Sequence, residues 1–506
     1  MSEKKRYLVS SRYNPQLDPN TARELEAFVA SREEVEIVKK TPVGRYVIEA
    51  TEDEIRDFSA KNPHLIFEED QKLDMFPMPG LPDVVSAGER HSREIIVKDA
   101  NNGNLLEDVT IYGIGSGPAY KAVTDAGGKA TLFTNEAELT RVIASPRRNY
   151  WSRVAQNIDM NDKSALEIQL KPLLVTGAYS WGHQLMGFGA VNRYWTGRTV
   201  KIGIIDSGIV NNLEDVRPLG GYNTLDGEDP AAWNVDESGH GTFCAGVVAA
   251  QNNAIGVLGG APNAEIYSVK VFPGGYASDL VEAVEWCIQN RMDVINMSLG
   301  TPDASQSLAN VLRDAHERGI TCIAAAGNDS TRVAYPAAFP TVIGVGAIGR
   351  FGTFPEDSAH ALKIGSETDW RGQLFSAGFT NFGPEINVCA PGVAILSTMP
   401  TGYVCWDGTS FSCPLVATLA ALILEACPII RTGNSSQPEY LRAIIQSSAT
   451  NLGLSRIVQG SGLPLARRAL SFASAYFSPY RATPYSRAFS LPYRGTPYSG
   501  AYTYSF

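Results

Sequence analysis

Cysteine is absent from the first 243 residues of this 506-residue chain, and none of its seven cysteines belongs to a C-x-x-C pair. The seven are Cys244, Cys287, Cys322, Cys389, Cys405, Cys413 and Cys427. No apolar stretch follows the charged residues 1–6, so a secretory leader is not expected either. An odd number of thiols without a leader is typical of buried free cysteines in a reducing compartment and disfavours a disulfide scaffold or a zinc site. We therefore expect a cytoplasmic protein, with leaderless export left open.

Long apolar runs and basic charge are also scarce. The longest strongly apolar stretch, residues 415–424, is shorter than the about 20 residues that a membrane span needs, so it predicts a core helix. The net charge of −10 leaves no basic excess to neutralise phosphates. These shortages argue against a membrane span and against nucleic acid as the main partner. The apolar content of 44% supports a substantial core, and the length is typical of three or four domains.

The first 91 residues divide into a charged segment and a short linker. Residues 1–76 alternate strand and helix patterns in the order β-α-β-β-α-β, which predicts a ferredoxin-like α+β domain. The sequence that begins at Thr51 has capping-box spacing and opens the second helix. Residues 77–91 begin with closely spaced prolines and are predicted to be a linker.

Residues 92–172 are predicted to be all-β. Strand-like runs at 95–97, 109–112 and 129–133 are separated by turn sequences that contain Asn-Gly and Gly-Gly. A small β-sandwich fits this pattern.

Residues 173–475 alternate apolar runs with helical patterns. Runs such as 200–205 and 321–326 are almost continuously apolar, which is typical of strands buried on both faces of a parallel sheet. This segment is therefore predicted to be α/β, with a parallel sheet flanked by helices. Residues 476–506 hold two copies of a 13-residue unit rich in proline and tyrosine, which predicts a disordered tail, with a docking strand as the alternative.

Three motifs in the α/β segment carry side chains suited to nucleophilic catalysis. Asp206 ends a buried strand, where a carboxylate is costly unless it is paired or solvated. His240 lies between two glycines, which let a substrate approach the imidazole closely. Ser410 follows a tight Gly-Thr turn and precedes a helix with Pro414 in its first turn, near free N–H groups and the positive end of a helix dipole. Taken singly, each has an ordinary structural explanation: a capping carboxylate, a core histidine and a serine N-cap.

The chain order of Asp206, His240 and Ser410, with the extended motifs around them, resembles the subtilisin-like serine proteases. The resemblance implies that His240 takes the proton of Ser410 and later returns it to the leaving amine, while Asp206 fixes the imidazole tautomer. Asn328, in the sequence AAAGN, matches the family's oxyanion asparagine, and the backbone N–H of Ser410 would be the second donor.

Further matches extend the resemblance over about residues 180–450. Ser298, Leu299 and Gly300 match the segment that lines the substrate cleft and would hold an extended peptide by strand pairing. Ala334 matches the base of the primary specificity pocket, where many members have glycine. We therefore expect a shallower pocket that favours medium-sized apolar side chains. The residues directly after Ser410 depart from the commonest pattern without removing a catalytic group.

Residues 249–259 resemble a calcium-binding loop of the bacterial members. The resemblance implies a side-chain oxygen from Asn253, backbone oxygens from Gln251, Ile255 and Val257, and a carboxylate ligand from Asp215. Hard oxygen ligands of this kind suit Ca²⁺. The family's N-terminal glutamine ligand finds no match, and an ordinary turn is the alternative.

Residues 1–76 resemble the inhibitory propeptides of the family, with an unrelated ferredoxin-like domain as the alternative. The resemblance implies that this N-terminal domain inhibits in cis and is cut near its own end. Met75 or Met78 is the predicted acyl donor, because a proline after Phe76 resists cleavage there. A competing site at residues 173–174 would also release the middle segment, which resembles a carboxypeptidase-regulatory-type sandwich.

The sequence thus predicts a serine endopeptidase that acts on peptides or proteins through an acyl-enzyme and is made as a self-inhibited zymogen. Two alternatives are a maturation protease dedicated to one partner and a catalytically silent scaffold that binds peptides. The complete triad and Asn328 argue against the silent scaffold, and the inserted sandwich favours a dedicated substrate.

Overall fold

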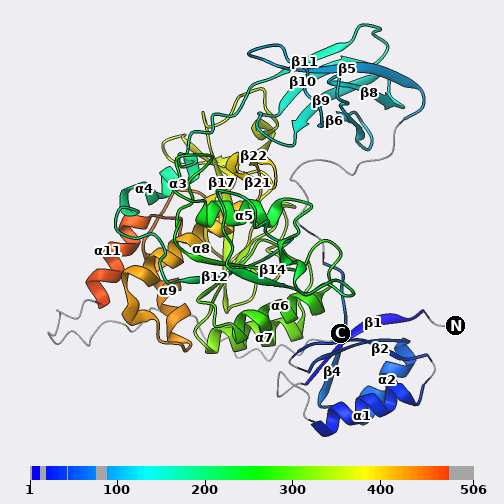
Figure 1. Cartoon of the computed structure of the whole chain (residues 1–506), viewed down its shortest axis with the longest axis vertical. Coiled ribbons are helices and arrows are strands. Elements are labelled where there is room, and N and C mark those ends of the chain that lie inside the picture. The colour runs from blue at the N-terminus through cyan, green and yellow to red at the C-terminus, as the bar shows by residue number, and fades with distance from the viewer. Residues whose placement is uncertain are drawn as a thin grey trace.

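Three regions follow one another along the chain in the computed structural model, which describes residues 3–11, 19–32, 34–42, 44–73, 75 and 88–477. They are the N-terminal region (residues 3–75), the sandwich region (88–172) and the C-terminal region (173–477). Figure 1 shows the N-terminal region beside α6 and α7 of the C-terminal region, and the sandwich region at the opposite end, near β21 and β22. Most of the predicted linker and the predicted tail from residue 478 lie outside the described residues.

The N-terminal region has the element order β-α-β-β-α-β, and its strands form one antiparallel sheet in the order β2-β3-β1-β4. Its elements are β1 (Lys5–Ser11), α1 (Pro19–Ala30), β2 (Glu36–Lys40), β3 (Tyr46–Ala50), α2 (Glu52–Lys61) and β4 (Leu65–Glu69). Thr51 and Glu54 form a complete capping box at the start of α2. Side chains alternate along β1, so Tyr7 and Val9 enter the region's own core, whereas Leu8 joins the apolar cluster of α6 and α7. The sheet therefore lies between its own helices and the C-terminal region.

The sandwich region consists of two sheets with strand orders β10-β9-β6-β7 and β11-β5-β8. Its strands are β5 (His91–Asp99), β6 (Val109–Ile114), β7 (Tyr120–Val123), β8 (Lys129–Thr134), β9 (Glu138–Pro146), β10 (Arg153–Asp159) and β11 (Leu166–Leu170). Buried and exposed residues alternate strictly along β8, where Ala130, Leu132 and Thr134 point inward. The inner faces of the two sheets thus enclose an apolar core of their own.

The C-terminal region is built on a nine-stranded sheet of order β13-β14-β12-β15-β16-β17-β19-β18, with β20 also paired to β17. Its strands are β12 (Lys201–Asp206), β13 (Gly220–Asn223), β14 (Glu265–Lys270), β15 (Val294–Met297), β16 (Thr321–Ala325), β17 (Val342–Arg350), β18 (Ile364–Thr368), β19 (Leu374–Ala377), β20 (Ile386–Pro391), β21 (Ile395–Met399), β22 (Gly402–Trp406), β23 (Ala449–Thr450) and β24 (Leu463–Pro464). Its helices are α3 (Trp181–Met186), α4 (Phe188–Val191), α5 (His240–Ala249), α6 (Ala277–Gln289), α7 (Gln306–Glu317), α8 (Thr409–Ala426), α9 (Ser436–Ser447), α10 (Arg456–Gln459) and α11 (Ala466–Phe477). Within the nine-stranded sheet, as far as the structure describes it, strands β13 to β17 pair in parallel, and only β18 and β19 form antiparallel pairs. The predicted α/β class with a parallel sheet flanked by helices is confirmed.

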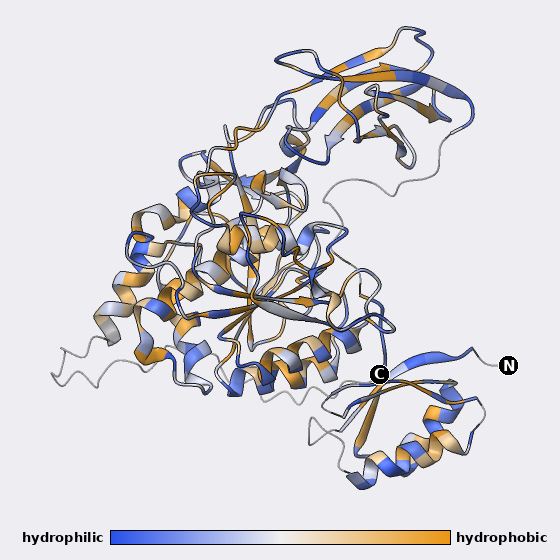
Figure 2. Ribbon diagram, in the orientation of Figure 1, coloured by the Kyte–Doolittle hydropathy of each residue, from blue (hydrophilic) through white to orange (hydrophobic). Residues whose placement is uncertain are grey.

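Apolar side chains fill both faces of this sheet, and Figure 2 shows its central strands as largely hydrophobic. Helix α8 is long and apolar enough to cross a membrane by length and composition, but 89% of its apolar window is buried inside the protein. Its apolar character is thus explained by its place in the core, as predicted for residues 415–424. All seven cysteines are buried and unpaired, which agrees with the expectation of free thiols.

Candidate active site

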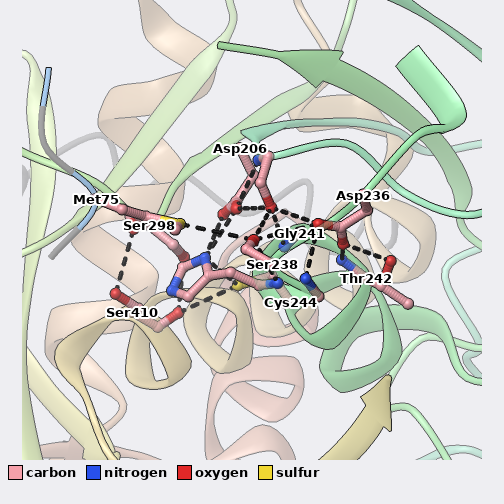
Figure 3. A network of polar contacts seen from close by, with 12 residues as sticks. Met75, Asp206, Asp236, Ser238, Gly241, Thr242, Cys244, Ser298 and Ser410 are labelled. Carbon is pink, nitrogen blue, oxygen red and sulfur yellow. Dashed lines mark hydrogen bonds and ion pairs between the residues drawn. The ribbon is translucent and has the colours of Figure 1, made fainter. Parts of the chain in front are cut away.

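Three predicted site residues meet at the carboxyl-terminal edge of the parallel strands (Figure 3). Asp206 is the last residue of β12, His240 the first residue of α5, and Ser410 the second residue of α8. Open α/β sheets bind ligands outside the carboxyl ends of their strands, so the fold places these side chains where a substrate site is expected.

Asp206 and His240 form a buried hydrogen-bonded pair. His240 Nδ1 lies 2.8 Å from Asp206 Oδ1 and 3.0 Å from Oδ2. The N–H of Ser207 also donates to Asp206 Oδ1 at 2.8 Å, which holds the carboxylate in one orientation. Burial lowers the pKa of His240, but the Asp206 carboxylate and Cys244 together outweigh it and raise that pKa well above its ordinary 6.5. Because Nδ1 faces the carboxylate, the neutral imidazole keeps its proton on Nδ1 and leaves Nε2 as the acceptor.

Ser410 is anchored at the start of α8 by Ser298. Ser410 Oγ donates to the Ser298 carbonyl at 3.2 Å, and Ser298 Oγ donates to the Ser410 carbonyl at 2.7 Å. Within the described part of the chain, no hydrogen bond joins Ser410 Oγ to His240. Such bonds are often long before a substrate binds, so this geometry is compatible with a nucleophile at rest. The Ser410 N–H is among the first N–H groups of α8, which lack acceptors within the helix.

Asn328, three residues after β16, presents an amide donor beside the serine turn. Its Oδ1 accepts from the N–H of Thr409 at 3.0 Å and from the Thr409 hydroxyl at 2.9 Å. Because a backbone N–H can only donate, this contact fixes which end of the carboxamide is the oxygen. Nδ2 is therefore the end that can donate, and it lies 3.4 Å from the position a Cβ would take on Gly408. Asn328 Nδ2 and the N–H of Ser410 together offer two donors to a developing negative charge.

A second carboxylate, Asp236, organises the loop before α5, and the sequence analysis did not identify it. Its Oδ1 accepts from Ser207 Oγ and from the N–H of Gly239, both at 2.8 Å. Its Oδ2 accepts from the N–H of Thr242 at 2.9 Å and from the Thr242 hydroxyl at 2.6 Å. These bonds tie the end of β12 to the start of α5, on which the geometry of the histidine–aspartate pair depends. The available signal was an acidic residue four positions before the histidine, in the sequence DESGH.

Cys244 lies one helical turn after His240, with its Sγ 4.0 Å from Nδ1. Ligand atoms of Asp206, His240 and Cys244 all lie within 4.8 Å of one another, close enough to hold a metal ion. Burial raises the pKa of the Cys244 thiol to about 11, so the thiol is neutral near neutral pH. The cluster is therefore a hydrogen-bonded imidazole beside a neutral thiol.

Three aromatic rings from three elements surround the imidazole. The ring centroids of Trp406 and Phe411 lie 6.5 and 5.4 Å from that of His240, and Phe243 stacks on Trp406 at 5.2 Å. This packing limits rotation of the imidazole and keeps water from its buried side. Because the rings belong to α5, β22 and α8, no local pattern in the sequence indicated the cluster.

The predicted substrate segment Ser298-Leu299-Gly300 follows β15 directly. The side chains of Ser298 and Leu299 are fully buried, the first against the serine turn and the second in an apolar cluster that also contains Leu73 of the N-terminal region. These side chains therefore serve packing, and the backbone is what this segment can offer to a peptide.

Ala334, predicted to form the base of the specificity pocket, lies close to the strand that leads to Asn328. Its N–H donates to the carbonyl of Ala326 at 2.9 Å. A Cβ built on Gly327 would lie 3.5 Å from the Ala334 methyl group. The structure thus places Ala334 against residues 326–327, directly before Asn328, and its role in a specificity pocket stays a prediction.

The five predicted calcium ligands lie together, but protein groups occupy the side-chain oxygens of two of them. The Asp215 carboxylate accepts from the Tyr403 hydroxyl at 2.7 Å, from Asn253 Nδ2 at 3.0 Å and from the N–H of Val257 at 3.4 Å. Asn253 Oδ1 is engaged as well, because it accepts from the N–H of Ile255 at 3.1 Å. A calcium ion needs several oxygens aimed at one point, whereas here O–H and N–H groups surround the only carboxylate of the set. As arranged, the side chains of Asp215 and Asn253 do not fit the predicted calcium ion.

Gln251, predicted to offer its backbone oxygen, uses its side chain and its N–H to close the loop. Its carboxamide donates to two backbone carbonyls, those of Ala249 at 3.1 Å and Pro262 at 2.8 Å. Its backbone N–H donates to the Asp215 carbonyl at 2.7 Å. The loop is therefore closed by its own hydrogen bonds.

The end of the N-terminal region runs toward the site. Residues 71–73 pair in antiparallel fashion with residues 275–277, and the N–H of Leu73 donates to a carbonyl of that segment at 2.8 Å. Met75 Sδ lies 3.8 Å from the hydroxyl of Ser238, and Figure 3 draws it within the same polar network as the three site residues. An extended segment of this chain thus ends beside the histidine–aspartate pair.

Comparisons with known proteins point to one family. The family model described as "Subtilase family" matches residues 197–463, more than half of the chain. Subtilisin DY of Bacillus licheniformis is 40% identical over 278 residues, which cover 53% of this chain and 90% of that protein. Subtilisin E of Bacillus subtilis (strain 168) is 40% identical over 278 residues, 53% of this chain and 65% of its own. The alkaline protease of Alkalihalobacillus alcalophilus is 36% identical over 294 residues, 57% of this chain and 69% of its own. The family match begins after the N-terminal and sandwich regions.

Proposed function

The chain belongs to the subtilase family and is a serine endopeptidase, and we propose that it cleaves through Asp206, His240 and Ser410 and is made as a self-inhibited zymogen. The observation that carries the catalytic part is the buried bond between Asp206 and His240 beside a serine at a helix start, with the Asn328 amide next to it.

In this mechanism the Ser410 hydroxyl attacks the scissile carbonyl while His240 Nε2 takes its proton. Asp206 keeps the other imidazole proton on Nδ1 and stabilises the imidazolium that forms. The tetrahedral oxyanion receives hydrogen bonds from Asn328 Nδ2 and the N–H of Ser410. His240 then protonates the leaving amine, and water releases the acyl group from Ser410.

Labelling of the nucleophile with a fluorophosphonate tests this assignment. Ser410→Ala should abolish both labelling and peptide hydrolysis. Ser412→Ala is the matched control, because Ser412 lies on the same helix but its hydroxyl donates to the backbone carbonyls of residues 390 and 391. Ser412→Ala should therefore keep labelling, whereas a label on any other residue in the wild type would end the triad assignment. A wild type that folds but neither labels nor cleaves would be the silent scaffold.

The self-inhibition part of the proposal rests first on residues 71–73 and Met75. Residues 71–73 pair in antiparallel fashion with residues 275–277, and strand pairing of this kind is one way to bind an extended peptide. Leu73 is 2% exposed and enters the apolar cluster that contains Leu299. Met75 contacts Ser238, two residues before His240, which supports a role for this end of the N-terminal region in covering the site.

Ionic contacts hold the body of the N-terminal region on α6. Lys39 Nζ lies 2.5 Å from Asp279 Oδ1 and 2.7 Å from Glu282 Oε2, and these carboxylates raise the pKa of the lysine despite its burial. Arg45 is fully buried and pairs through Nε with Glu285. Among the described residues, neither buried Nη atom of Arg45 has a hydrogen-bond partner, which costs free energy and limits the affinity of the contact. An interface of limited affinity suits an inhibitor that has to dissociate from the enzyme during maturation.

Maturation should cut near Met75, so intact-mass measurement and N-terminal sequencing after incubation test the zymogen proposal. Met78, the alternative acyl donor, and Phe76 lie outside the described residues. A cut at residues 173–174 would instead remove about 100 further residues from the mature enzyme. Ser410→Ala should remain uncut in the same incubation, and an active wild type that keeps residues 1–76 intact would refute the zymogen.

A further inference from the structure

The sandwich region is hydrogen-bonded to the hairpin of β21 and β22 through Asn149. The N–H of Asn149 donates to the Tyr403 carbonyl at 2.6 Å, and the N–H of Tyr403 donates to Asn149 Oδ1 at 3.1 Å. The backbone of Asn149 is left-handed, with φ of 61°, a conformation that asparagine tolerates better than most residues. Gly402 is also needed, because a Cβ there would lie 2.7 Å from Asn149 Oδ1. Two hydrogen bonds and two unusual backbone positions thus define the contact.

A second contact reaches the residue three positions before Ser410. The ring of Trp151 meets the imidazole of His360 edge-on, with centroids 5.6 Å apart. His360 Nδ1 lies 2.8 Å from Asp407 Oδ1, which also accepts from the N–H of Ala394 at 2.8 Å. Burial works against ionisation of Asp407, but the neighbouring imidazole keeps its pKa below the usual range. Asp407 is therefore a fixed anion beneath the sandwich region.

Two residues shortly after Trp151 strengthen this second contact. Val154 N–H donates to the Asp357 carbonyl at 2.7 Å, and the N–H of Ala359 donates to Ser152 Oγ at 3.1 Å. Both partners lie in the loop that carries His360. The sandwich region thus holds that loop at several adjacent points.

The segment between the two contacts leads into the active site. Strand β22 (Gly402–Trp406) ends at Trp406, whose ring stacks on Phe243 and packs near His240. Asp407 and a glycine then lead into α8, on which Ser410 is the second residue. The sandwich region therefore contacts Tyr403 directly and reaches Asp407 through His360. The segment between these two residues leads to Ser410 and carries Trp406, whose ring lies near His240.

Tyr403 extends the same connection to the Asp215 loop. Its hydroxyl donates to Asp215 Oδ2 at 2.7 Å, within the cluster where the sequence predicted calcium. Through Asn149, the sandwich region therefore fixes the position of Tyr403, whose hydroxyl donates to the Asp215 carboxylate. This hydrogen bond occupies a carboxylate that the sequence predicted to bind calcium.

We propose that the sandwich region is a permanent part of the mature endopeptidase and that Asn149 and Trp151 are positioning residues for Ser410. This inference rests on the proposed serine-protease mechanism. It requires the maturation cut to fall before the sandwich region, between residues 74 and 90, rather than at 173–174.

The test uses the full-length chain with substitutions at the two contacts. Asn149→Gly removes the Oδ1 acceptor while glycine keeps the left-handed backbone, and Trp151→Ala removes the ring above His360. The conservative variants Asn149→Asp and Trp151→Phe should restore function. Phe133→Ala is the aromatic control, because Phe133 is 44% exposed on β8 of the same region.

Three quantities are measured well below each variant's melting temperature: the rate of fluorophosphonate labelling, kcat and KM. We expect Asn149→Gly and Trp151→Ala to slow labelling and lower kcat by about 10-fold or more, because small displacements of a nucleophile cost that much, with KM little changed. Phe133→Ala and the two conservative variants should stay near wild type.

Labelling of both contact variants at the wild-type rate would overturn the proposal, and so would a fully active mature enzyme that lacks the sandwich region. If Trp151→Ala fails to fold, Asn149→Gly decides alone. Absence of labelling in the wild type would refute the proposed function instead, so the two failures are distinguishable.

Discussion

Replacement of Glu68 should weaken self-inhibition by an amount that its contacts determine. Glu68 lies in β4 and accepts hydrogen bonds from the N–H groups of Gln306 and Ser307 and from the Ser305 hydroxyl, at the start of α7. A carboxylate there satisfies two helix N–H groups that have no acceptor within the helix and faces the positive end of its dipole. Hydrogen bonds to charged groups contribute about 1.5–3 kcal/mol each, but Glu68 is half-buried and water replaces part of the interaction. We expect a net loss of about 2 kcal/mol for Glu68→Ala, which is about a 30-fold rise in the inhibition constant.

The assay adds residues 1–76 as a separate fragment to the processed enzyme and measures competitive inhibition of peptide hydrolysis. Glu69→Ala is the matched control, because the neighbouring carboxylate is 56% exposed and pairs with Lys5 inside the N-terminal region at 2.9 Å. That control should change the inhibition constant little. Equal effects of Glu68→Ala and Glu69→Ala would show that the contact with α7 does not hold the inhibitor.

Four further outcomes follow from the site. Activity should rise with pH through a midpoint above 6.5, because Asp206 raises the pKa of His240 and the base must be neutral to act; a midpoint below 6.5 in the pH–rate profile would contradict this. Asn328→Ala should lower kcat by about 10²–10³ with little change in KM, and an unchanged kcat would remove the residue from the mechanism. The melting temperature should be the same in excess calcium and in chelator, because protein donors satisfy Asp215; stabilisation by calcium, about 2.7 kcal/mol at 100 times its dissociation constant, would restore the predicted metal site. Alkylating reagents should spare Cys244, whose pKa of about 11 keeps it protonated, and rapid inactivation through that thiol would contradict the assigned burial.

Local patterns predicted the elements whose signals are strong. The capping box at Thr51 forms as expected, because its two bonds lie within one turn of the chain. The apolar runs of β12 and β16 indicated strands buried on both faces, and all five residues of β16 are buried. Strands β10 and β11 were not identified. Most residues of β10 are exposed or half-buried, so its seven residues carry little hydrophobic signal.

The side chains of the candidate site also fall into two groups, those that the local sequence predicted and those that it did not. Asp206, His240 and Ser410 stand in motifs whose neighbours are adjacent in sequence, so residue order alone was enough to identify them. The roles of Asp236 and Trp406 depend on contacts between separate elements, and no spacing rule specifies which ring or carboxylate will approach the imidazole.

The sequence by itself determined the family of this protein and the residues proposed for its chemistry, because a nucleophile, a base and an oxyanion donor each require a particular residue type in a short, recognisable setting. Only the tertiary structure decided what surrounds that chemistry. It brought Tyr403 to Asp215, in place of the expected cation, and Asn149 to Tyr403. These bonds join residues that are 188 and 254 positions apart in the sequence. They arise when distant segments pack against one another, so a pattern within one segment cannot predict them.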